Sequence, residues 1–216
     1  MFGNLTIQEI AIYVIAFLLG VTVHEYAHAR MALAAGDDTA KRMGRVSLNP
    51  LDHLDPIGTV MFVFTILNGF GIAWGKPVPV NPYTFKKPRW DTFRVSIAGV
   101  VANFITAVIL AFILRFVVNT YIPGYAALLE TCMFFNLGLA FFNMIPVPPL
   151  DGSKVLASLL PPRWARWVDL VVSRYGIFIL LMLVLVPIGG RSVVGWILWP
   201  AVDAVGSLLL KFAYLG

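Results

Sequence analysis

The stretch HEYAH contains His24, Glu25 and His28 in the spacing HExxH, within a segment that is typical of a helix. Residues four apart lie on the same face of a helix, so both imidazoles can bind one metal ion. The glutamate between them can then take a proton from a water molecule on that ion, because zinc makes such a water acidic near neutral pH. These residues predict a hydrolytic zinc site, with His24 and His28 as ligands and Glu25 as the general base.

A catalytic zinc ion needs a further protein ligand and keeps one position open for water. The chain has three histidines in total, so an oxygen ligand is expected. Asp151 is the favoured residue, because it follows an apolar segment that prolines interrupt and precedes Gly152, which lets the backbone turn. The alternative is that Asp151 is an aspartate of an ordinary loop.

The composition predicts that most of the chain lies in lipid. Of the 216 residues, 59% are hydrophobic and 12% are charged, against roughly 45–50% and about 25% in soluble domains. A transmembrane helix needs about 20 mostly apolar residues, and we expect helices over residues 7–35, 92–119, 125–143, 167–186 and 193–214. The expected fold is an all-α membrane protein with about five transmembrane helices. We expect one integral membrane domain over 1–216, with a core over 7–160 and C-terminal helices over 161–216.

The HExxH residues lie in the first of these apolar segments. Ionisable side chains are costly inside a bilayer, and those found there usually have a function. The alternative is a polar cluster that only packs helices together. The net charge of +5 does not indicate a nucleic-acid partner, because the basic residues cluster in loops between apolar segments.

The HEYAH stretch and Asn143-Met-Ile-Pro-Val-Pro-Pro-Leu-Asp-Gly152 together resemble the paired signature of the site-2 protease family of intramembrane zinc metalloproteases. The resemblance covers about residues 15 to 160. It implies that His24, His28 and Asp151 bind one zinc ion and that Glu25 is the general base. It further implies that Asn143 orients the substrate or stabilises the oxyanion. The substrate would then be a membrane-spanning or membrane-adjacent polypeptide, cleaved in regulated intramembrane proteolysis.

The chain is similar to the small prokaryotic members of that family, because it has no PDZ-like insertion. Asn103, in Ala98-Gly99-Val100-Val101-Ala102-Asn103, resembles another recurring family element and is a candidate substrate-binding residue. An interhelical hydrogen bond explains Asn103 equally well.

The two motifs meet at one metal ion only if their helices run parallel, which requires an odd number of crossings between them. Residues 92–119 supply one crossing, so residues 57–75 are expected to enter and leave on the same side. Asn68-Gly69 is a strong turn signal and favours a re-entrant β-like hairpin. A complete helix over 57–75 is the alternative.

The charge pattern predicts the orientation in the plasma membrane. With the N-terminus outside, all of the 16 lysines and arginines except Arg115 and Arg191 fall on the inner side or at inner helix ends. The chain would therefore be a multi-pass protein whose active site opens toward the cytoplasmic half of the bilayer.

The stretch GKPVPVNP is a candidate substrate-binding strand. In an extended strand, the N–H groups of Val78 and Val80 point to one edge, while residues 77 and 79 are prolines without an N–H. Val78 and Val80 could pair with an unwound substrate by strand addition. A rigid turn is the alternative.

Three further residues have less defined roles. The candidate roles of His53 are an additional metal ligand, a gate and a hydrogen-bonded structural residue. Asp203 lies in the last apolar segment near Pro200, where it can satisfy backbone groups at a kink. Cys132, the single cysteine, is expected to be a free buried thiol.

Two other functions compete with proteolysis. A transporter or metal carrier could bind zinc at the same residues, and a scaffold could bind membrane helices without catalysis. A transporter keeps its function when Glu25 is replaced by Gln, and a scaffold keeps it when the ligands are lost, whereas a protease does neither. The sequence carries no prediction of the oligomeric state.

Overall fold

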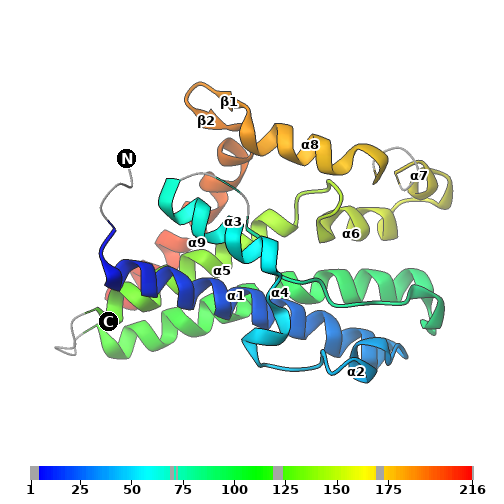
Figure 1. Cartoon of the computed structure of the whole chain (residues 1–216), viewed down its shortest axis with the longest axis horizontal. Coiled ribbons are helices and arrows are strands. Elements are labelled where there is room, and N and C mark those ends of the chain that lie inside the picture. The colour runs from blue at the N-terminus through cyan, green and yellow to red at the C-terminus, as the bar shows by residue number, and fades with distance from the viewer. Residues whose placement is uncertain (1–4, 69–70, 72, 119–123, 169–172, 216) are drawn as a thin grey trace.

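The computed structural model describes residues 5–68, 71, 73–118, 124–168 and 173–215 (Figure 1). Its long helices are α1 (Ile7–Ala35), α4 (Pro88–Val117), α5 (Tyr125–Asn143) and α9 (Val193–Tyr214). The shorter helices are α2 (Thr39–Arg42), α3 (Pro56–Asn68), α6 (Asp151–Leu159), α7 (Pro162–Trp167) and α8 (Ser173–Leu185), with 3₁₀ turns η1 (Pro50–His53) and η2 (Pro82–Thr84). Strands β1 (Pro187–Ile188) and β2 (Arg191–Ser192) pair antiparallel.

Helix α1 has clear end signals in the sequence. Thr6 and Glu9 form a capping box, in which the Glu9 N–H donates to the Thr6 hydroxyl and the Thr6 N–H donates to the Glu9 carboxylate. The helix ends at Gly36, whose φ of 106° lies in the left-handed region that favours glycine. The predicted range 7–35 is therefore confirmed.

Among the described residues, α1, α4, α5 and α9 are long and apolar enough to cross a membrane. Helices α1 and α5 run in one direction and α4 runs in the other (Figure 1). The parallel arrangement that the metal site requires is thus present, with one long helix as the return.

The expected fifth crossing over 167–186 is not confirmed. In this region the structure has α7 and then α8, which has 13 residues. A helix of that length spans about 20 Å, and a hydrocarbon core is about 30 Å thick. Residues 169–172, inside the predicted range, lie outside the described residues.

The expected β-like hairpin over 57–75 is not confirmed either, because residues Pro56–Asn68 form a helix of 13 residues, α3. Asp55 caps it, since the Gly58 N–H donates to the Asp55 carboxylate at 2.8 Å. After Gly58, residues 59–68 contain no glycine or proline that would break the helix. Gly75 pairs with Leu54 in an isolated bridge, so the chain returns to the start of α3. Gly69, half of the predicted turn, lies outside the described residues.

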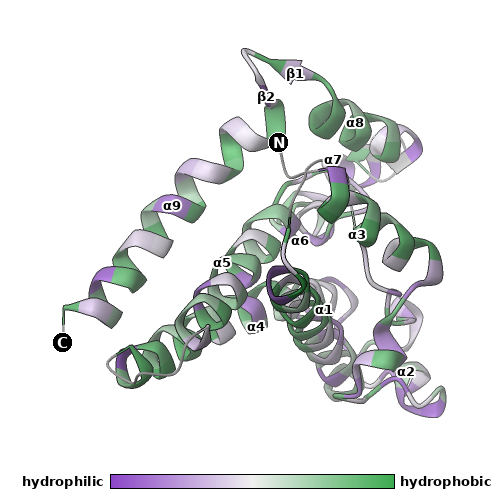
Figure 2. Cartoon of the chain, turned by 60° about the vertical axis from the view of Figure 1, so that its left-hand side comes forward, coloured by the Kyte–Doolittle hydropathy of each residue, from purple (hydrophilic) through white to green (hydrophobic). Residues whose placement is uncertain are grey.

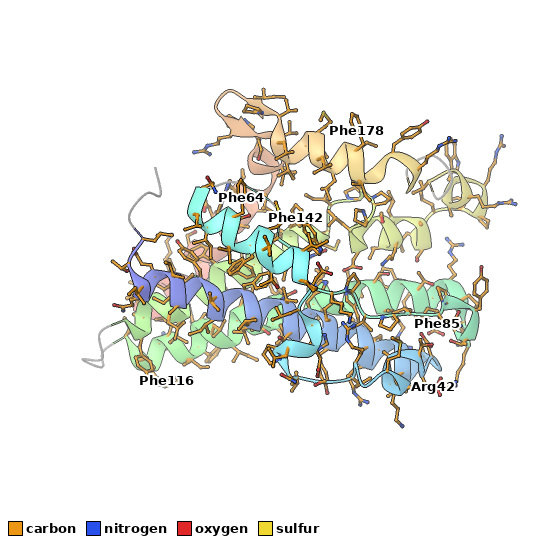
Figure 3. All side chains as sticks on the ribbon, viewed as in Figure 1. Arg42, Phe64, Phe85, Phe116, Phe142 and Phe178 are labelled. Carbon is orange, nitrogen blue, oxygen red and sulfur yellow. The ribbon has the colours of Figure 1, made fainter. Side chains whose placement is uncertain are left out.

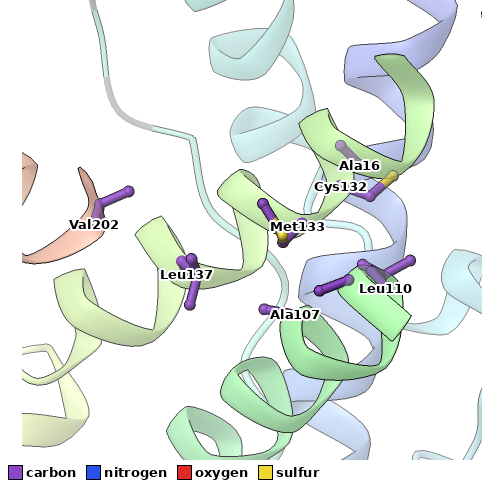
Figure 4. Packing of buried hydrophobic residues seen from close by; sticks show 8 residues of the cluster. Ala16, Ala107, Leu110, Cys132, Met133, Leu137 and Val202 are labelled. Carbon is purple, nitrogen blue, oxygen red and sulfur yellow. The ribbon is translucent and has the colours of Figure 1, made fainter. Parts of the chain in front are cut away.

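The main hydrophobic core lies where α1, α4, α5 and α9 meet (Figure 4). Several of its buried side chains are small, which allows membrane helices to approach closely. Its members are Ala16, Ala107, Leu110, Ala111, Cys132, Met133, Leu137 and Val202. The expectation that Cys132 is a free buried thiol is confirmed.

Large apolar side chains also face outward from several helices. Phe64 on α3, Phe116 on α4 and Phe178 on α8 are all exposed, and Phe116 and Phe178 lie at the periphery of the molecule (Figure 3). Hydrophobic residues dominate α4 and α5, while hydrophilic residues gather around α2 (Figure 2). Large exposed apolar side chains on these helices fit contact with lipid.

Candidate metal centre

Three ligand atoms converge between α1 and the start of α6. His24 Nε2 lies 3.1 Å from Asp151 Oδ2, and His28 Nε2 lies 3.0 Å from the same oxygen. The two Nε2 atoms are 3.0 Å apart. All three residues are buried, and in the described part of the chain they form a group that could hold a metal ion.

The opposite ring nitrogens fix the tautomers of both histidines. His24 Nδ1 lies 2.7 Å from Asn103 Oδ1, and His28 Nδ1 lies 2.7 Å from the Val95 carbonyl oxygen. Each of these oxygens accepts a hydrogen bond, so each Nδ1 carries the hydrogen. Both Nε2 atoms therefore present lone pairs toward Asp151, which is the usual arrangement of histidines that bind metals.

This donor set fits zinc. Two imidazole nitrogens and a carboxylate oxygen, all without hydrogen, repel one another at about 3 Å unless a cation lies among them. Two histidines and one acidic residue are a known ligand set for catalytic zinc, with a fourth position open for water. His24, His28 and Asp151 would hold the ion.

Helix α4 closes one side of the site through Gly99. A Cβ atom at this position would lie 2.5 Å from His28 Nε2 and 2.6 Å from His24 Cε1. Only glycine leaves room for both imidazoles, so this residue sets how closely α4 approaches the ligands.

Glu25 lies beside the ligands on α1 and is half-buried. Its Oε2 accepts a hydrogen bond of 2.8 Å from the Val78 N–H. The sequence favoured this N–H as a contact for substrate, but in the structure it donates to the Glu25 carboxylate. Val78 itself is buried against Ala29 and Ala40.

The segment over residues 76–81, which carries Val78, forms no strand in the structure but is held at both ends. The Lys76 N–H donates to the His53 carbonyl oxygen at 2.8 Å, and Arg45 Nη2 donates to the Lys76 carbonyl oxygen at 2.8 Å. The Asn81 N–H donates to Asp37 Oδ2 at 2.6 Å. The loop before α3 and the residues after α1 thus fix the 76–81 segment against Glu25.

The structure does not bring every predicted site residue to the ligands. His53 is fully buried, its Nε2 lies 2.8 Å from the Ser47 carbonyl oxygen, and it is outside the group of ligand atoms. Asn103 is also fully buried, and its amide contacts His24, Gly20 and Asn136. This burial does not support a contact between Asn103 and substrate.

Two other predicted residues, Asn143 and Asp203, do not contact the three metal-ligand side chains. Asn143, at the end of α5, donates from Nδ2 to the Leu139 carbonyl oxygen at 3.0 Å. Asp203, on α9, is exposed and lines a cavity of about 760 Å³ with residues of α8 and the β1–β2 turn.

Asn136 and Lys154 belong to the surroundings of the site and were not identified from the sequence. Asn136 Oδ1 accepts a hydrogen bond of 2.8 Å from Asn103 Nδ2, and Lys154 Nζ lies 3.5 Å from Asp151 Oδ1. Asn136 could have been found as an amide in the middle of an apolar segment. Lys154 gives no such signal in a polar stretch.

Comparison with known proteins agrees with this geometry. The chain matches Peptidase family M50 over residues 12–125 and 119–186. The chain belongs to this family, the site-2 proteases. Its members include zinc metalloproteases, and the present chain is one by its sequence, its buried ligand group and its membrane helices.

Individual relatives have the same assignment. The chain is 40% identical to "Putative zinc metalloprotease YwhC" of Bacillus subtilis over 206 residues, which are 92% of this chain and 89% of that protein. It is 27% identical to "Putative zinc metalloprotease Rip2" of Mycolicibacterium smegmatis, over 85% of this chain and 70% of that protein. A shorter match, 35% identical over 37% of this chain and 23% of the relative, is to "Zinc metalloprotease MJ0392" of Methanocaldococcus jannaschii. No solved structure shows a significant similarity to the chain.

Proposed function

We propose that this M50 metalloprotease cleaves membrane-spanning or membrane-adjacent polypeptides, with His24, His28 and Asp151 as zinc ligands and Glu25 as the general base. The convergence of three buried ligand atoms carries the proposal, because two of them, from His24 and His28, belong to α1, a helix of spanning length. A hydrolytic site held by such a helix acts on substrates that share the bilayer.

Zinc at these ligands supplies a Lewis acid that polarises the scissile carbonyl and makes water acidic. Glu25 takes the proton of the attacking water and gives it to the leaving nitrogen. The Val78 N–H holds Glu25 Oε2 at 2.8 Å, which orients the carboxylate and leaves Oε1 for the water. Asn103 and the Val95 carbonyl keep the histidine rings oriented.

The substrate must unwind before it is cut, because a helical peptide bond is shielded by side chains and engaged in hydrogen bonds. An unwound segment in the bilayer needs new partners for its backbone groups. The Val78 N–H donates to Glu25 and is not free for substrate. We therefore assign the Val80 N–H to the substrate, which would pair with it by strand addition. Asn143 assists the oxyanion from the end of α5.

The enzyme lies in the plasma membrane with the N-terminus of α1 outside. Helix α2 and the segment over residues 76–81 are then on the cytoplasmic side, with most of the lysines and arginines. The site opens toward the cytoplasmic half of the bilayer, where locally unwound substrates meet Glu25.

The deciding experiment compares wild type with Glu25→Gln, purified in detergent, for zinc content and for cleavage of a peptide containing a membrane helix. Gln is the same size and keeps an oxygen for the Val78 N–H. We expect zinc in both proteins and a rate of cleavage that is at least about 100-fold lower in Glu25→Gln than in wild type.

Other outcomes would favour other functions. Equal zinc transport by both proteins, without cleavage, would show a metal carrier. Helix binding that persists after loss of His24, His28 and Asp151 would show a scaffold. Wild type that binds no zinc would overturn the metal centre itself.

A further inference from the structure

A line of hydrogen bonds leads from His24 through three helices. His24 Nδ1 on α1 lies 2.7 Å from Asn103 Oδ1 on α4, and Asn103 Nδ2 donates to Asn136 Oδ1 on α5 at 2.8 Å. Asn136 Nδ2 then donates to the Cys132 carbonyl oxygen at 2.8 Å. The line therefore connects the candidate metal centre to the backbone of a helix that supplies no ligand itself.

The two asparagines are costly to bury unless each polar atom has a partner. Asn103 and Asn136 are both 0% exposed. An unpaired amide in apolar surroundings costs on the order of a few kcal/mol. Every polar side-chain atom of the pair makes a hydrogen bond, so the pair is a complete unit.

The direction of each bond is fixed by a group that can only accept. The Cys132 carbonyl requires the nitrogen of Asn136, which turns Asn136 Oδ1 toward Asn103. Asn103 must then present its nitrogen to Asn136, which turns its own Oδ1 toward His24. An oxygen there requires the hydrogen of His24 on Nδ1 and leaves Nε2 as a ligand.

We propose that Asn136 is a positioning residue for the metal centre, acting through Asn103 on the tautomer and ring orientation of His24. The proposal rests on the proposed role of His24 as a zinc ligand. The Gly20 carbonyl, which also accepts from Asn103 Nδ2 at 2.9 Å, supports the same orientation of Asn103. Loss of Asn136 therefore weakens the site and does not abolish it.

A role in helix packing alone makes a different prediction. If Asn136 only joins α5 to α4, its loss lowers stability but leaves the zinc affinity of the folded protein unchanged. If it acts through Asn103, its loss lowers zinc affinity only while Asn103 is present. A double-mutant cycle separates the two roles.

The experiment measures zinc dissociation constants by competition with a chelator, on full-length protein in detergent. The variants are Asn136→Leu, Asn103→Leu and the double variant, which remove hydrogen-bonding groups without leaving a cavity. We expect Asn136→Leu to weaken zinc about tenfold and Asn103→Leu by about 10- to 100-fold, as for other partners of metal-binding histidines. The double variant should match Asn103→Leu within about twofold.

Two further variants serve as controls. Asn136→Asp keeps the oxygen that accepts from Asn103, and its protonated form can still donate to Cys132, so zinc affinity should stay within about threefold of wild type. Leu137→Ala truncates the fully buried neighbour on α5; it should lower the unfolding temperature and leave zinc affinity unchanged. Visible spectra of the cobalt-substituted proteins should change for Asn136→Leu and not for Leu137→Ala.

Two results would overturn the proposal while leaving the protease assignment intact. One is wild-type zinc affinity in folded Asn136→Leu, and the other is additive loss in the double variant. If wild type itself binds no zinc, both the proposed function and this role of Asn136 fail. These readouts require no substrate, so they are independent of the cleavage assay.

Discussion

At the scale of single residues, the absence of a side chain at Gly99 matters as much as the ligands. A Cβ atom there would lie 2.5 Å from His28 Nε2, closer than real Cβ atoms approach. We expect Gly99→Ala to push α4 away from the imidazoles and to weaken zinc binding at least about tenfold. Chelator competition measures the loss.

Gly138 provides the matched substitution in the neighbouring helix α5. A Cβ atom at this position would have no atom within 4 Å. Gly138→Ala should leave zinc affinity unchanged and keep or raise thermal stability, because alanine is favoured over glycine in a helix by about 1 kcal/mol. Equal zinc loss in both variants would show that Gly99 has no special relation to the site.

The site residues divide into those that side-chain patterns reveal and those that they do not. HExxH and the Pro-rich stretch before Asp151 predicted three side chains that the structure brings within 3.1 Å of one another. The Val95 carbonyl was not foreseeable, because every residue has a carbonyl and only the packing of α4 on α1 selects this one. The same packing explains why Asn103 faces His24 and not a substrate.

At the scale of elements, the segment over residues 76–81 contacts Glu25 through the Val78 N–H. Val78→Pro removes the donor to Glu25 while keeping an extended backbone beside two existing prolines. We expect unchanged zinc content and a fall in kcat of about tenfold, because a misoriented base transfers protons less efficiently.

Val78→Ala is the control, since it keeps the N–H and trims only the side chain. It should retain most of the wild-type kcat. Val80→Pro tests the other part of the segment: loss of a substrate contact should raise KM and leave kcat nearly unchanged. A fall in kcat for Val80→Pro as large as that for Val78→Pro would contradict the separate roles.

The far end of the 76–81 segment is held by Asp37, whose contribution to stability depends on pH. Burial raises the pKa of this carboxyl, but hydrogen bonds from Thr39 and from the Asn81 N–H outweigh it, so the pKa lies below its usual value. A depressed pKa means that the stabilisation is present above about pH 4, the value in an unfolded chain, and is lost as the pH falls through the folded pKa.

Asp37→Asn should therefore reduce the free energy of unfolding at pH 7 by about 2 kcal/mol, as expected for a lost charge-assisted hydrogen bond. The difference from wild type should shrink below about pH 4. Thermal unfolding in detergent across this range measures it. A difference that is constant with pH would mean that the charge of Asp37 does not contribute.

Element boundaries were predictable where the chain has strong end signals. The ranges 7–35, 125–143 and 193–214 agree with α1, α5 and α9, helped by Gly36 and by prolines beyond the helices. Helix α3 replaces the hairpin that Asn68-Gly69 favoured, because Asp55 and Pro56 start a helix that continues to Asn68. Residues between these signals favour neither structure strongly.

At the scale of the whole molecule, the contacts of α9 favour an even number of crossings. Arg115 Nη1 donates to the Phe212 carbonyl oxygen at 2.7 Å, and the Tyr214 hydroxyl donates to Glu130. The end of α9 thus lies where α4 stops and α5 begins, at the same end of the bundle as the start of α1 (Figure 1). Four crossings satisfy this arrangement, whereas the five expected from the sequence place the termini on opposite sides.

Labelling of intact cells with a membrane-impermeant maleimide tests the number of crossings. In a Cys132→Ser background, which removes the single native cysteine, we expect Gln8→Cys and Leu215→Cys both to react from outside. Lys41→Cys, on α2, should react only after permeabilisation. If Leu215→Cys reacts only after permeabilisation, the chain crosses the membrane an odd number of times, as the five predicted crossings require.

The separation of the ligands along the chain has a consequence for biosynthesis. His24 and Asp151 are 127 residues apart, and a ribosome adds roughly 5–20 residues per second. For about 6 to 25 seconds the nascent chain holds the HExxH helix in the bilayer without its third ligand. The ligand set is therefore incomplete while α1, α4 and α5 are being made, and only α6 to α9 are synthesised once all three ligands are present in the chain.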